Sequence, residues 1–244
     1  MDGLLAGQRV LVVGGSAGIG LAVAKAAHAS GAAVVVVGRD ATQLEGARAE
    51  IGAVATHVAD AGDETSLERL FDAVDRFDHL VTTVHESSSL LGADRTMAEI
   101  GLAAAQRYMG AKFWAQYSVA KCGLRRLSDR GSITFTSGIA SRRTLPRHSV
   151  IGATNAAIEA AARQLAREIA PRRVNVVSPG LTVTRTYSHM DEAARKTFFD
   201  HIAAVLPVGH IGRAEDVAVA YLFAMSCAYL TGVVIDVDGG YSII

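Results

Sequence analysis

Residues 10–20 constrain the fold of this chain more than any other stretch, and they read V-L-V-V-G-G-S-A-G-I-G. A short β-branched run ends in a glycine-rich turn, and residues 21–29 then have the alanine-rich composition of a helix. This order of strand, turn and helix is the context that a phosphate-binding turn needs. Gly14 permits the tight turn, Gly18 lets the backbone approach a pyrophosphate, and Gly20 lets the helix pack close to the strand. The stretch therefore predicts a dinucleotide site at the end of the first strand.

Composition excludes several other kinds of protein. Half of the 244 residues are hydrophobic (50%) and 20% are charged, as in a well-buried globular chain. Lys plus Arg and Asp plus Glu both number 24, so a net charge of zero gives no case for nucleic acid or an anionic membrane as partner. Cys122 and Cys227 lie far apart without metal-ligand spacing. We expect no metal site, no signal peptide, no membrane span and a cytoplasmic setting.

Strands and helices alternate along the whole sequence, without a proline- or serine-rich linker and without a repeat. Regular alternation predicts an α/β fold: a single-domain, Rossmann-type, doubly wound parallel sheet over residues 1–244, with helices on both faces. We expect about seven strands in the order 3-2-1-4-5-6-7, and ligands at their carboxyl ends. After the first strand, we expect strands at 34–37, 53–59, 80–84, 132–136, 173–177 and 233–237, and helices at 41–51, 64–77, 97–127, 149–169 and 214–225, with a polar stretch through about 205 before the last helix.

The glycine spacing G-x-x-x-G-x-G resembles that of the short-chain dehydrogenase/reductase family, whose usual form has threonine where this chain has Val13. The stretch 175–180, N-V-V-S-P-G, looks like the R-V-N-x-V-x-P-G of that family, and residues 209–240 are similar to its C-terminal signature. The resemblance runs from about Leu4 to the end of the chain. It implies hydride transfer between a nicotinamide cofactor and a small-molecule carbonyl or alcohol compound. It also implies a homodimer or homotetramer, paired through the two long helices.

Residues at the end of the second strand favour NADP(H), although NAD(H) stays open. An acid at this place binds the ribose hydroxyls of NAD, whereas an arginine accommodates the 2′-phosphate of NADP. Here Gly38 removes the acid, Arg39 can grip a phosphate, and Ser16 can add a hydroxyl. In the competing interpretation, Asp40 binds the ribose and Arg39 is a solvated surface residue.

Further cofactor contacts follow from the resemblance. Asp60, after the third strand, matches the position near the adenine, although a role as a helix or turn cap is the alternative. Asn155 can hydrogen-bond ribose hydroxyls. The remaining expected contacts are Ile19, Thr83, Pro179, Gly180, Thr182 and Thr184.

The proton-transfer residues of the family are the point of departure. The family uses a tyrosine, a lysine four residues later, a serine and an asparagine. Tyr117 and Lys121 have the right spacing but precede the fifth strand, whereas the family pair follows it. Alignment of residues 153–157 with A-S-K-A-A puts Ile151 at the tyrosine position and Asn155 at the lysine position. An isoleucine cannot exchange a proton, so the usual mechanism is absent.

The other two positions also differ. The serine aligns with Ser137 or, one residue on, with Gly138, and the asparagine position holds Arg107. The family's N-N-A-G after the fourth strand is replaced by T-T-V-H, which ends in His85. We hypothesise that His148 or His85 supplies the proton, because imidazole titrates near neutral pH, and that Ser137 polarises the substrate.

Two loops flank the expected substrate pocket. The basic run 142–147 either favours an anionic substrate or is a solvated arginine loop. Residues 181–199 lie where the family keeps a mobile lid, and Tyr187, His189 and Met190 are candidates to line a pocket there.

The sequence predicts an NADP(H)-dependent oxidoreductase with a non-standard proton donor. The alternative is a catalytically silent NADP(H)-binding sensor or partner subunit on the same fold. A scaffold that binds no nucleotide is disfavoured, because the three glycines and Arg39 are intact.

Overall fold

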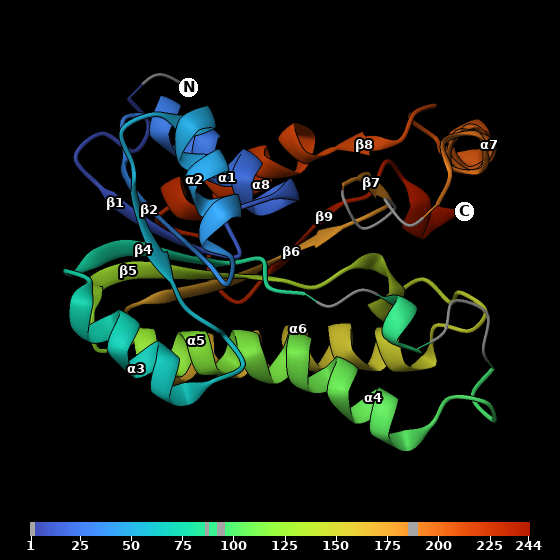
Figure 1. The fold of residues 1–244 in the computed structure, drawn as a ribbon, viewed down its shortest axis with the longest axis horizontal. Coiled ribbons are helices and arrows are strands. Elements are labelled where there is room, and N and C mark those ends of the chain that lie inside the picture. Colours follow the sequence, from blue (N-terminus) through green and yellow to red (C-terminus); the bar gives the residue numbers. More distant parts are fainter. Residues whose placement is uncertain (1–2, 86–87, 92–95, 185–189) are drawn as a thin grey trace.

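A seven-stranded parallel sheet is the centre of the computed structural model, which describes residues 3–85, 88–91, 96–184 and 190–244. Its strand order is β3-β2-β1-β4-β5-β6-β9 (Figure 1). This confirms the predicted Rossmann-type order, because β9 occupies the place of the seventh sheet strand. The strands are β1 (Arg9–Val13), β2 (Ala33–Gly38), β3 (Ala55–Val58), β4 (Phe77–Thr82), β5 (Leu127–Thr136), β6 (Arg173–Pro179) and β9 (Val234–Val237).

Helices cover both faces of this sheet (Figure 1). One face carries α1 (Gly18–Ala29), α2 (Ala41–Ile51) and α8 (Ala214–Ser226). The other face carries α3 (Glu64–Ala73), α4 (Leu102–Met109), a π-helix (Gly110–Trp114), α5 (Ala115–Gly123) and α6 (Ser149–Glu168). Short 3-10 helices lie at Ser88–Leu91, Ile139–Ser141 and Tyr241–Ile243.

The central strand β1 explains why its sequence is a continuous apolar run. Val10 and Val12 belong to the hydrophobic cluster under α1 and α8. Leu11 and Val13 point the other way, into the cluster under α3, α5 and α6. Successive side chains of a strand alternate between faces, so a strand buried on both sides needs apolar residues at every position.

Two predicted helices differ from those observed. The expected helix 64–77 ends at Ala73, because Val74 is extended (φ −93°, ψ 143°). Phe77 then begins β4, where its backbone N–H donates to the carbonyl of Arg126 at 3.1 Å. The expected helix 97–127 begins only at Leu102, contains the π-helical turn and ends at Gly123, so that β5 starts five residues earlier than the predicted 132.

The stretch predicted only as polar contains further elements. The helix α7 (Glu192–Val205) begins after Asp191, whose carboxylate accepts from the backbone N–H of Ala194 at 2.8 Å. The short strands β7 (Thr182–Val183), before α7 in the sequence, and β8 (Gly212–Arg213), after it, pair with each other in parallel. Within the described ranges, no helix is long and apolar enough to cross a membrane.

Candidate functional site

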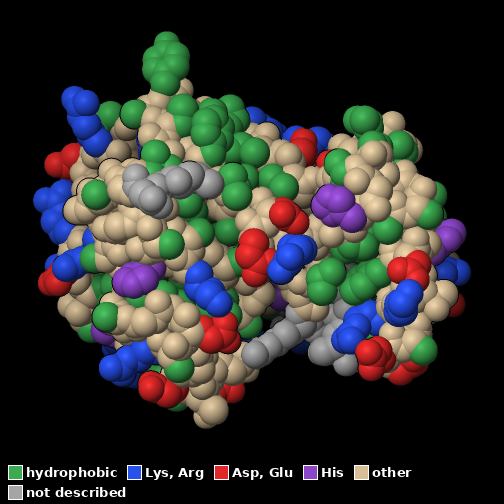
Figure 2. All heavy atoms as spheres, turned by 90° about the horizontal axis from the view of Figure 1, so that it is seen from above, with side chains coloured by type: hydrophobic (Ala, Val, Ile, Leu, Met, Phe, Trp, Pro, Cys, Tyr) green, Lys and Arg blue, Asp and Glu red, His purple; other side chains and the backbone are tan. Residues whose placement is uncertain are grey.

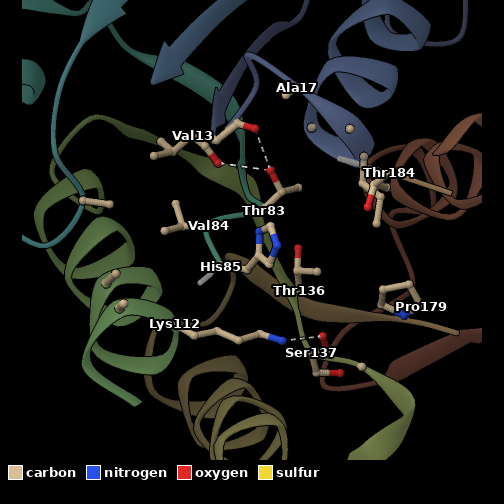
Figure 3. Close-up of a pocket in the computed structure, with 18 of the residues that line it drawn as sticks. Val13, Ala17, Thr83, Val84, His85, Lys112, Thr136, Ser137, Pro179 and Thr184 are labelled. Carbon is tan, nitrogen blue, oxygen red and sulfur yellow. Dashed lines mark hydrogen bonds between the residues drawn. The ribbon is translucent and has the colours of Figure 1, made fainter. Parts of the chain in front are cut away.

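A cleft of about 1030 Å³ opens at the carboxyl ends of the sheet strands (Figure 3). Its walls come from the turn after β1, the ends of β2, β4, β5 and β6, the π-helix and the start of α6. The structure brings together in this one cleft every residue that the sequence assigned to cofactor or catalysis: Gly14, Ser16, Gly18, Ile19, Gly20, Arg39, Asp60, Thr83, Ser137, His148, Ile151, Asn155, Pro179, Gly180, Thr182 and Thr184.

The glycine turn is built so tightly that side chains are excluded from two of its positions. A Cβ on Gly20 would lie 2.2 Å from the carbonyl oxygen of Gly14, and one on Gly14 would lie 2.8 Å from Thr83 Oγ1. Thr83 Oγ1 in turn donates to the Gly14 carbonyl at 3.0 Å (Figure 3). Gly18 has a φ of +54°, and a Cβ added there would lie 3.5 Å from Thr184 Cγ2. Ala17, the N-cap residue of α1, makes no side-chain capping hydrogen bond, and the first residues of the helix, Gly18 to Gly20, line the cleft.

The residues that decide between the two dinucleotides sit at the end of β2. Arg39 is exposed on the cleft wall, and a Cβ on Gly38 would lie 3.0 Å from Ser16 Oγ. Asp40 caps α2, since its Oδ1 accepts from the backbone N–H of Thr42 at 2.8 Å and of Gln43 at 3.1 Å. The Gln43 bond is the main cause that lowers the pKa of Asp40. The carboxylate therefore already has a structural role, which weakens its alternative assignment to the ribose.

Of the two roles that the sequence left open for Asp60, the structure shows the turn cap. Asp60 lines the cleft, and its Oδ1 also accepts from the backbone N–H of Gly62 at 2.9 Å, as in a turn. The lid residues Tyr187 and His189 lie outside the described residues, and Met190 is half-buried and outside the cleft.

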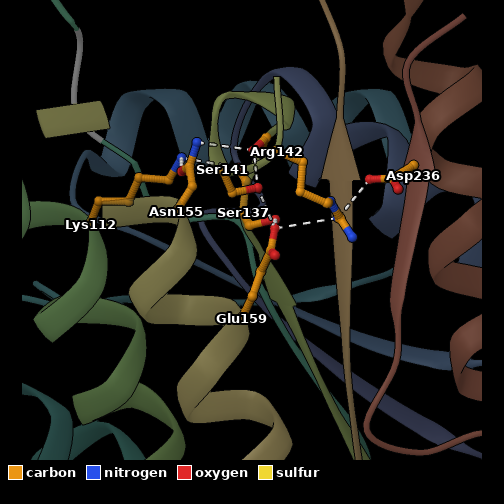
Figure 4. A network of polar contacts seen from close by, with 8 residues as sticks. Lys112, Ser137, Ser141, Arg142, Asn155, Glu159 and Asp236 are labelled. Atoms are coloured by element: carbon orange, nitrogen blue, oxygen red, sulfur yellow. Dashed lines mark hydrogen bonds and ion pairs between the residues drawn. The ribbon is translucent and has the colours of Figure 1, made fainter. Parts of the chain in front are cut away.

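Ser137 lines the cleft, but its hydroxyl already has a partner within the protein. Its Oγ donates to Glu159 Oε1 at 2.9 Å, and the residue is 2% exposed (Figure 4). The hydroxyl proton that was expected to polarise a substrate is therefore donated to Glu159 in this structure. Gly138 is the next residue, and a Cβ there would lie 3.0 Å from Asn155 Nδ2. The position beside Asn155 is therefore held by a glycine, which has no hydroxyl to offer.

Tyr117 and Lys121 lie outside the cleft lining. The Lys121 ammonium pairs with Glu64 at 2.5 Å on the surface, and the Tyr117 ring packs against Trp114 with centroids 5.8 Å apart. Both residues belong to α5, and their contacts lie away from the cleft. The structure thus gives the Tyr-x-x-x-Lys spacing a packing and surface role.

Lys112 is the site residue that sequence reasoning missed. It lies in the π-helix and is 7% exposed, and its Nζ donates to Asn155 Oδ1 at 2.7 Å and to the carbonyl of Ser137 at 3.0 Å (Figures 3 and 4). Burial lowers its pKa to about 8. Arg107, which was expected at this part of the site, does not line the cleft. The available signal was a lone lysine between Ala111 and Phe113 in an otherwise apolar stretch.

The basic run beside the pocket is tied into the protein. Arg142 donates to Glu159 at 3.4 Å and to Asp236 at 2.7 Å (Figure 4). Arg143 donates to the carbonyls of Tyr241 and Ile244, and its guanidinium lies 4.1 Å from the centroid of the Tyr241 ring. These two arginines therefore hold β9 and the last turn in place. Arg142 and Arg147 of the same run are exposed.

A crevice at the switch point of a doubly wound sheet, with a glycine turn at one end and polar side chains at the other, defines a dinucleotide-binding protein. Comparison with known proteins agrees. The family described as Enoyl-(Acyl carrier protein) reductase matches residues 13–242. The short-chain dehydrogenase/reductase ATR9 of Stachybotrys chlorohalonatus is 36% identical over 96% of both chains. The L-xylulose reductase of Bos taurus is 31% identical over 99% of both.

Solved structures give the same result. A small-chain dehydrogenase in complex with NADPH has a TM-score of 0.83 and 37% identity, covering 97% of this chain and 99% of that one. The MalC reductase/Diels-Alderase of Malbranchea aurantiaca has a TM-score of 0.88 and 28% identity, covering 99% of each. The chain belongs to the short-chain dehydrogenase/reductase family.

Proposed function

We propose that this chain is an NADP(H)-dependent oxidoreductase that transfers hydride between the nicotinamide and a small carbonyl or alcohol compound. The observation that carries the proposal is the single cleft, which joins Arg39 and the glycine turn to the polar wall at Asn155 and His148. The relative described in complex with NADPH supports the choice of cofactor, and the relatives named as reductases support the reaction. The residues in the cleft fit a dinucleotide, because the narrow turn leaves room for a backbone-bound pyrophosphate beside Gly18.

Calorimetric titration with NADPH, NADP and NAD tests the cofactor. We expect NADPH to bind the unaltered protein more tightly than NAD does. In Arg39→Ala, NADPH affinity should fall about 10–100-fold, because a charge-assisted hydrogen bond contributes about 1.5–3 kcal/mol. NAD affinity should change little. Arg48→Ala, on the same helix-strand unit but outside the cleft, is the matched control. Equal losses for NADPH and NAD in Arg39→Ala would contradict the preference.

The proton source is proposed to be a histidine of the cleft wall, with Asn155 holding the ligand by hydrogen bonds. His148 lies just before α6, and His85 lies beyond β4 and faces the cleft in Figure 3. After a screen has identified a carbonyl compound that consumes NADPH, replacing both histidines with alanine should lower kcat/KM by about 100-fold or more. His201→Ala, on α7, is the control. Unchanged turnover in the double variant would rule the histidines out.

A catalytically silent NADP(H)-binding sensor is the alternative, and it has its own support. Ile151, which the alignment places at the tyrosine position of the family, lines the cleft, and the Ser137 hydroxyl donates to Glu159. A sensor binds NADPH tightly but oxidises none of it with any carbonyl compound. It should stay silent even after Ile151→Tyr and Asn155→Lys restore the usual pair. Turnover by the unaltered protein excludes this alternative.

We also propose that the chain pairs into a homodimer or homotetramer through its long helices. Leu102 and Trp114 on the α4–π segment are 73% and 56% exposed. Val219 and Phe223 of α8 and Tyr229 of the following loop are also exposed. Hydrophobic side chains gather on part of the face shown in Figure 2. Light scattering of the purified protein measures this state directly.

A further inference from the structure

Lys112 is a buried amine in the wall of the cleft, and none of the roles expected from the sequence includes it. The residue lies in the π-helical turn Gly110–Trp114, and such turns occur frequently at functional sites. Burying an ammonium group is costly unless its hydrogen bonds are satisfied. A lysine in this place therefore calls for a physical reason.

In its charged form, the Lys112 ammonium group has one N–H group left after its two hydrogen bonds within the protein. An ammonium group has three N–H donors, and two of them go to Asn155 Oδ1 at 2.7 Å and the Ser137 carbonyl at 3.0 Å. Both acceptors are neutral oxygens. Asn155 is itself fixed, because its Nδ2 donates to the carbonyl of Gly138 at 3.2 Å. The neutral amine has two N–H groups and keeps both bonds, so gain or loss of one proton changes only what the Nζ atom offers to the cleft.

The positions that align with the family's serine and tyrosine offer no free hydroxyl in this wall. The Ser137 hydroxyl donates to Glu159, Gly138 has no side chain, and Ile151 has no polar atom. Lys112 therefore remains as a positively charged donor beside the position where the family has its tyrosine and serine.

We propose that Lys112 is the cationic hydrogen-bond donor of this cleft, and that its third N–H binds an oxygen atom of the bound ligand. The oxygen is either a ribose hydroxyl of the cofactor or the carbonyl oxygen of the substrate. The inference rests on the proposed function, in which bound NADPH supplies the hydride. When hydride adds to the carbonyl carbon, the electron pair of the C=O bond moves to oxygen, where a fixed ammonium stabilises the charge. The proton that oxygen finally takes comes from a separate acid, for which the cleft histidines are proposed.

The charged groups around Lys112 determine how pH acts on this contact. His85 comes from the loop after β4, His148 from the start of α6 and Tyr241 from the last 3-10 turn, all on the cleft wall. Glu159 of α6 is one hydrogen bond further away, behind Ser137. Arg39, Asp40 and Asp60 line the cleft at its β2 and β3 strand ends. Burial alone accounts for the lowered pKa of Lys112, about 8, so the ammonium is present below this pH and is lost above it.

Cofactor binding tests the first arm without any turnover. NADPH is titrated by calorimetry into the unaltered protein and Lys112→Met at pH 7 and pH 9, in two buffers of different ionisation enthalpy. If the third N–H binds a ribose hydroxyl, Lys112→Met lowers NADPH affinity at pH 7 by about 10–100-fold. The unaltered protein then takes up protons on binding NADPH at pH 9, and Lys112→Met does not. Lys121→Met, an exposed lysine paired with Glu64, is the matched control and should behave as the unaltered protein.

Steady-state kinetics tests the second arm with a carbonyl compound from the screen. If the N–H binds the substrate oxygen, NADPH affinity is unchanged in Lys112→Met but kcat/KM falls by about 10–100-fold. In the unaltered protein kcat/KM then falls above pH 8, and the drop is absent in Lys112→Met. The double variant Lys112→Asn with Asn155→Lys exchanges the two residues, so that the amine comes from α6 and the amide from the π-helix. It should recover part of the loss in kcat/KM. Its melting temperature and that of Lys112→Met show whether each variant is folded.

Folded Lys112→Met with unchanged NADPH affinity, unchanged proton uptake and unchanged kcat/KM would overturn the inference while leaving the proposed function intact. Absence of NADPH binding by the unaltered protein would instead overturn the proposed function, and this inference with it.

Discussion

Replacing Gly20 with alanine is expected to abolish tight dinucleotide binding and to destabilise the fold. A Cβ at this position would lie 2.2 Å from the carbonyl oxygen of Gly14 and 2.5 Å from Thr83 Oγ1. The nearest of these is a backbone atom, so the turn itself has to move. Overpacking of this kind lowers the free energy of unfolding by about 1–3 kcal/mol. If a similar free-energy cost arises only in the complex with NADPH, it weakens NADPH binding by up to ~100-fold. Urea unfolding and calorimetry measure the two effects.

Gly46→Ala is the matched control for this prediction. Gly46 lies inside α2, has nothing within 4 Å of an added Cβ, and does not line the cleft. Alanine is favoured over glycine in a helix by about 1 kcal/mol, so this variant should be slightly more stable and bind NADPH normally. If Gly20→Ala bound NADPH as Gly46→Ala does, the turn would have no part in holding the cofactor.

Replacing Glu159 with alanine is expected to lower the free energy of unfolding by about 1–3 kcal/mol, the cost of leaving buried hydrogen-bond donors without their acceptor. Glu159 is 5% exposed, and its Oε1 accepts from the hydroxyls of Ser137 at 2.9 Å and Ser141 at 2.6 Å and from Arg142 at 3.4 Å. These donors join α6 to the loop after β5 (Figure 4). Without the carboxylate, the buried Ser137 hydroxyl loses its acceptor. Chemical denaturation gives the value.

Two further variants separate the causes of this loss. Glu159→Gln keeps an acceptor oxygen but removes the charge, so its loss should be smaller than that of Glu159→Ala. Glu64→Ala removes an exposed partner of Lys121 and should cost no more than about 1 kcal/mol. A loss as small for Glu159→Ala as for Glu64→Ala would show that the network contributes little to stability.

The sheet was predictable because its evidence is local. Four adjacent valines and a glycine turn mark strands buried on both faces, and the observed strand order follows from regular alternation. Element ends were less accurate where a tertiary contact decides them. The end of α3 is an example, because Phe77 leaves the helical pattern to pair beside Arg126, which is 49 positions away in the sequence. No periodicity within residues 64–77 reveals that partner.

The residues that the motifs singled out as cofactor contacts all line one cleft, whereas the arrangement of its polar wall could not be derived from the motifs. The direction of the Ser137 hydroxyl depends on Glu159, which lies one α6 turn beyond Asn155 and is invisible in the motif around Ser137. Lys112 was missed because the comparison with the family pattern assigned the asparagine position to Arg107. The observed helix changes its hydrogen bonding in between, and with it the residue that faces the cleft.

The π-helical turn at Gly110–Trp114 joins α4 to α5 in one continuous helical segment and changes the rotational phase between them. Each residue of an α-helix turns by about 100°, so a locally wider turn puts the segments before and after it out of phase. The first segment buries Tyr108, and the second buries Ala115 and Val119 against the sheet. Lys112 lies in the turn between α4 and α5 and lines the cleft, while both helices keep their buried apolar residues. An insertion or deletion within the turn would therefore change the direction of the Lys112 side chain, while the buried faces of α4 and α5 could keep their own contacts.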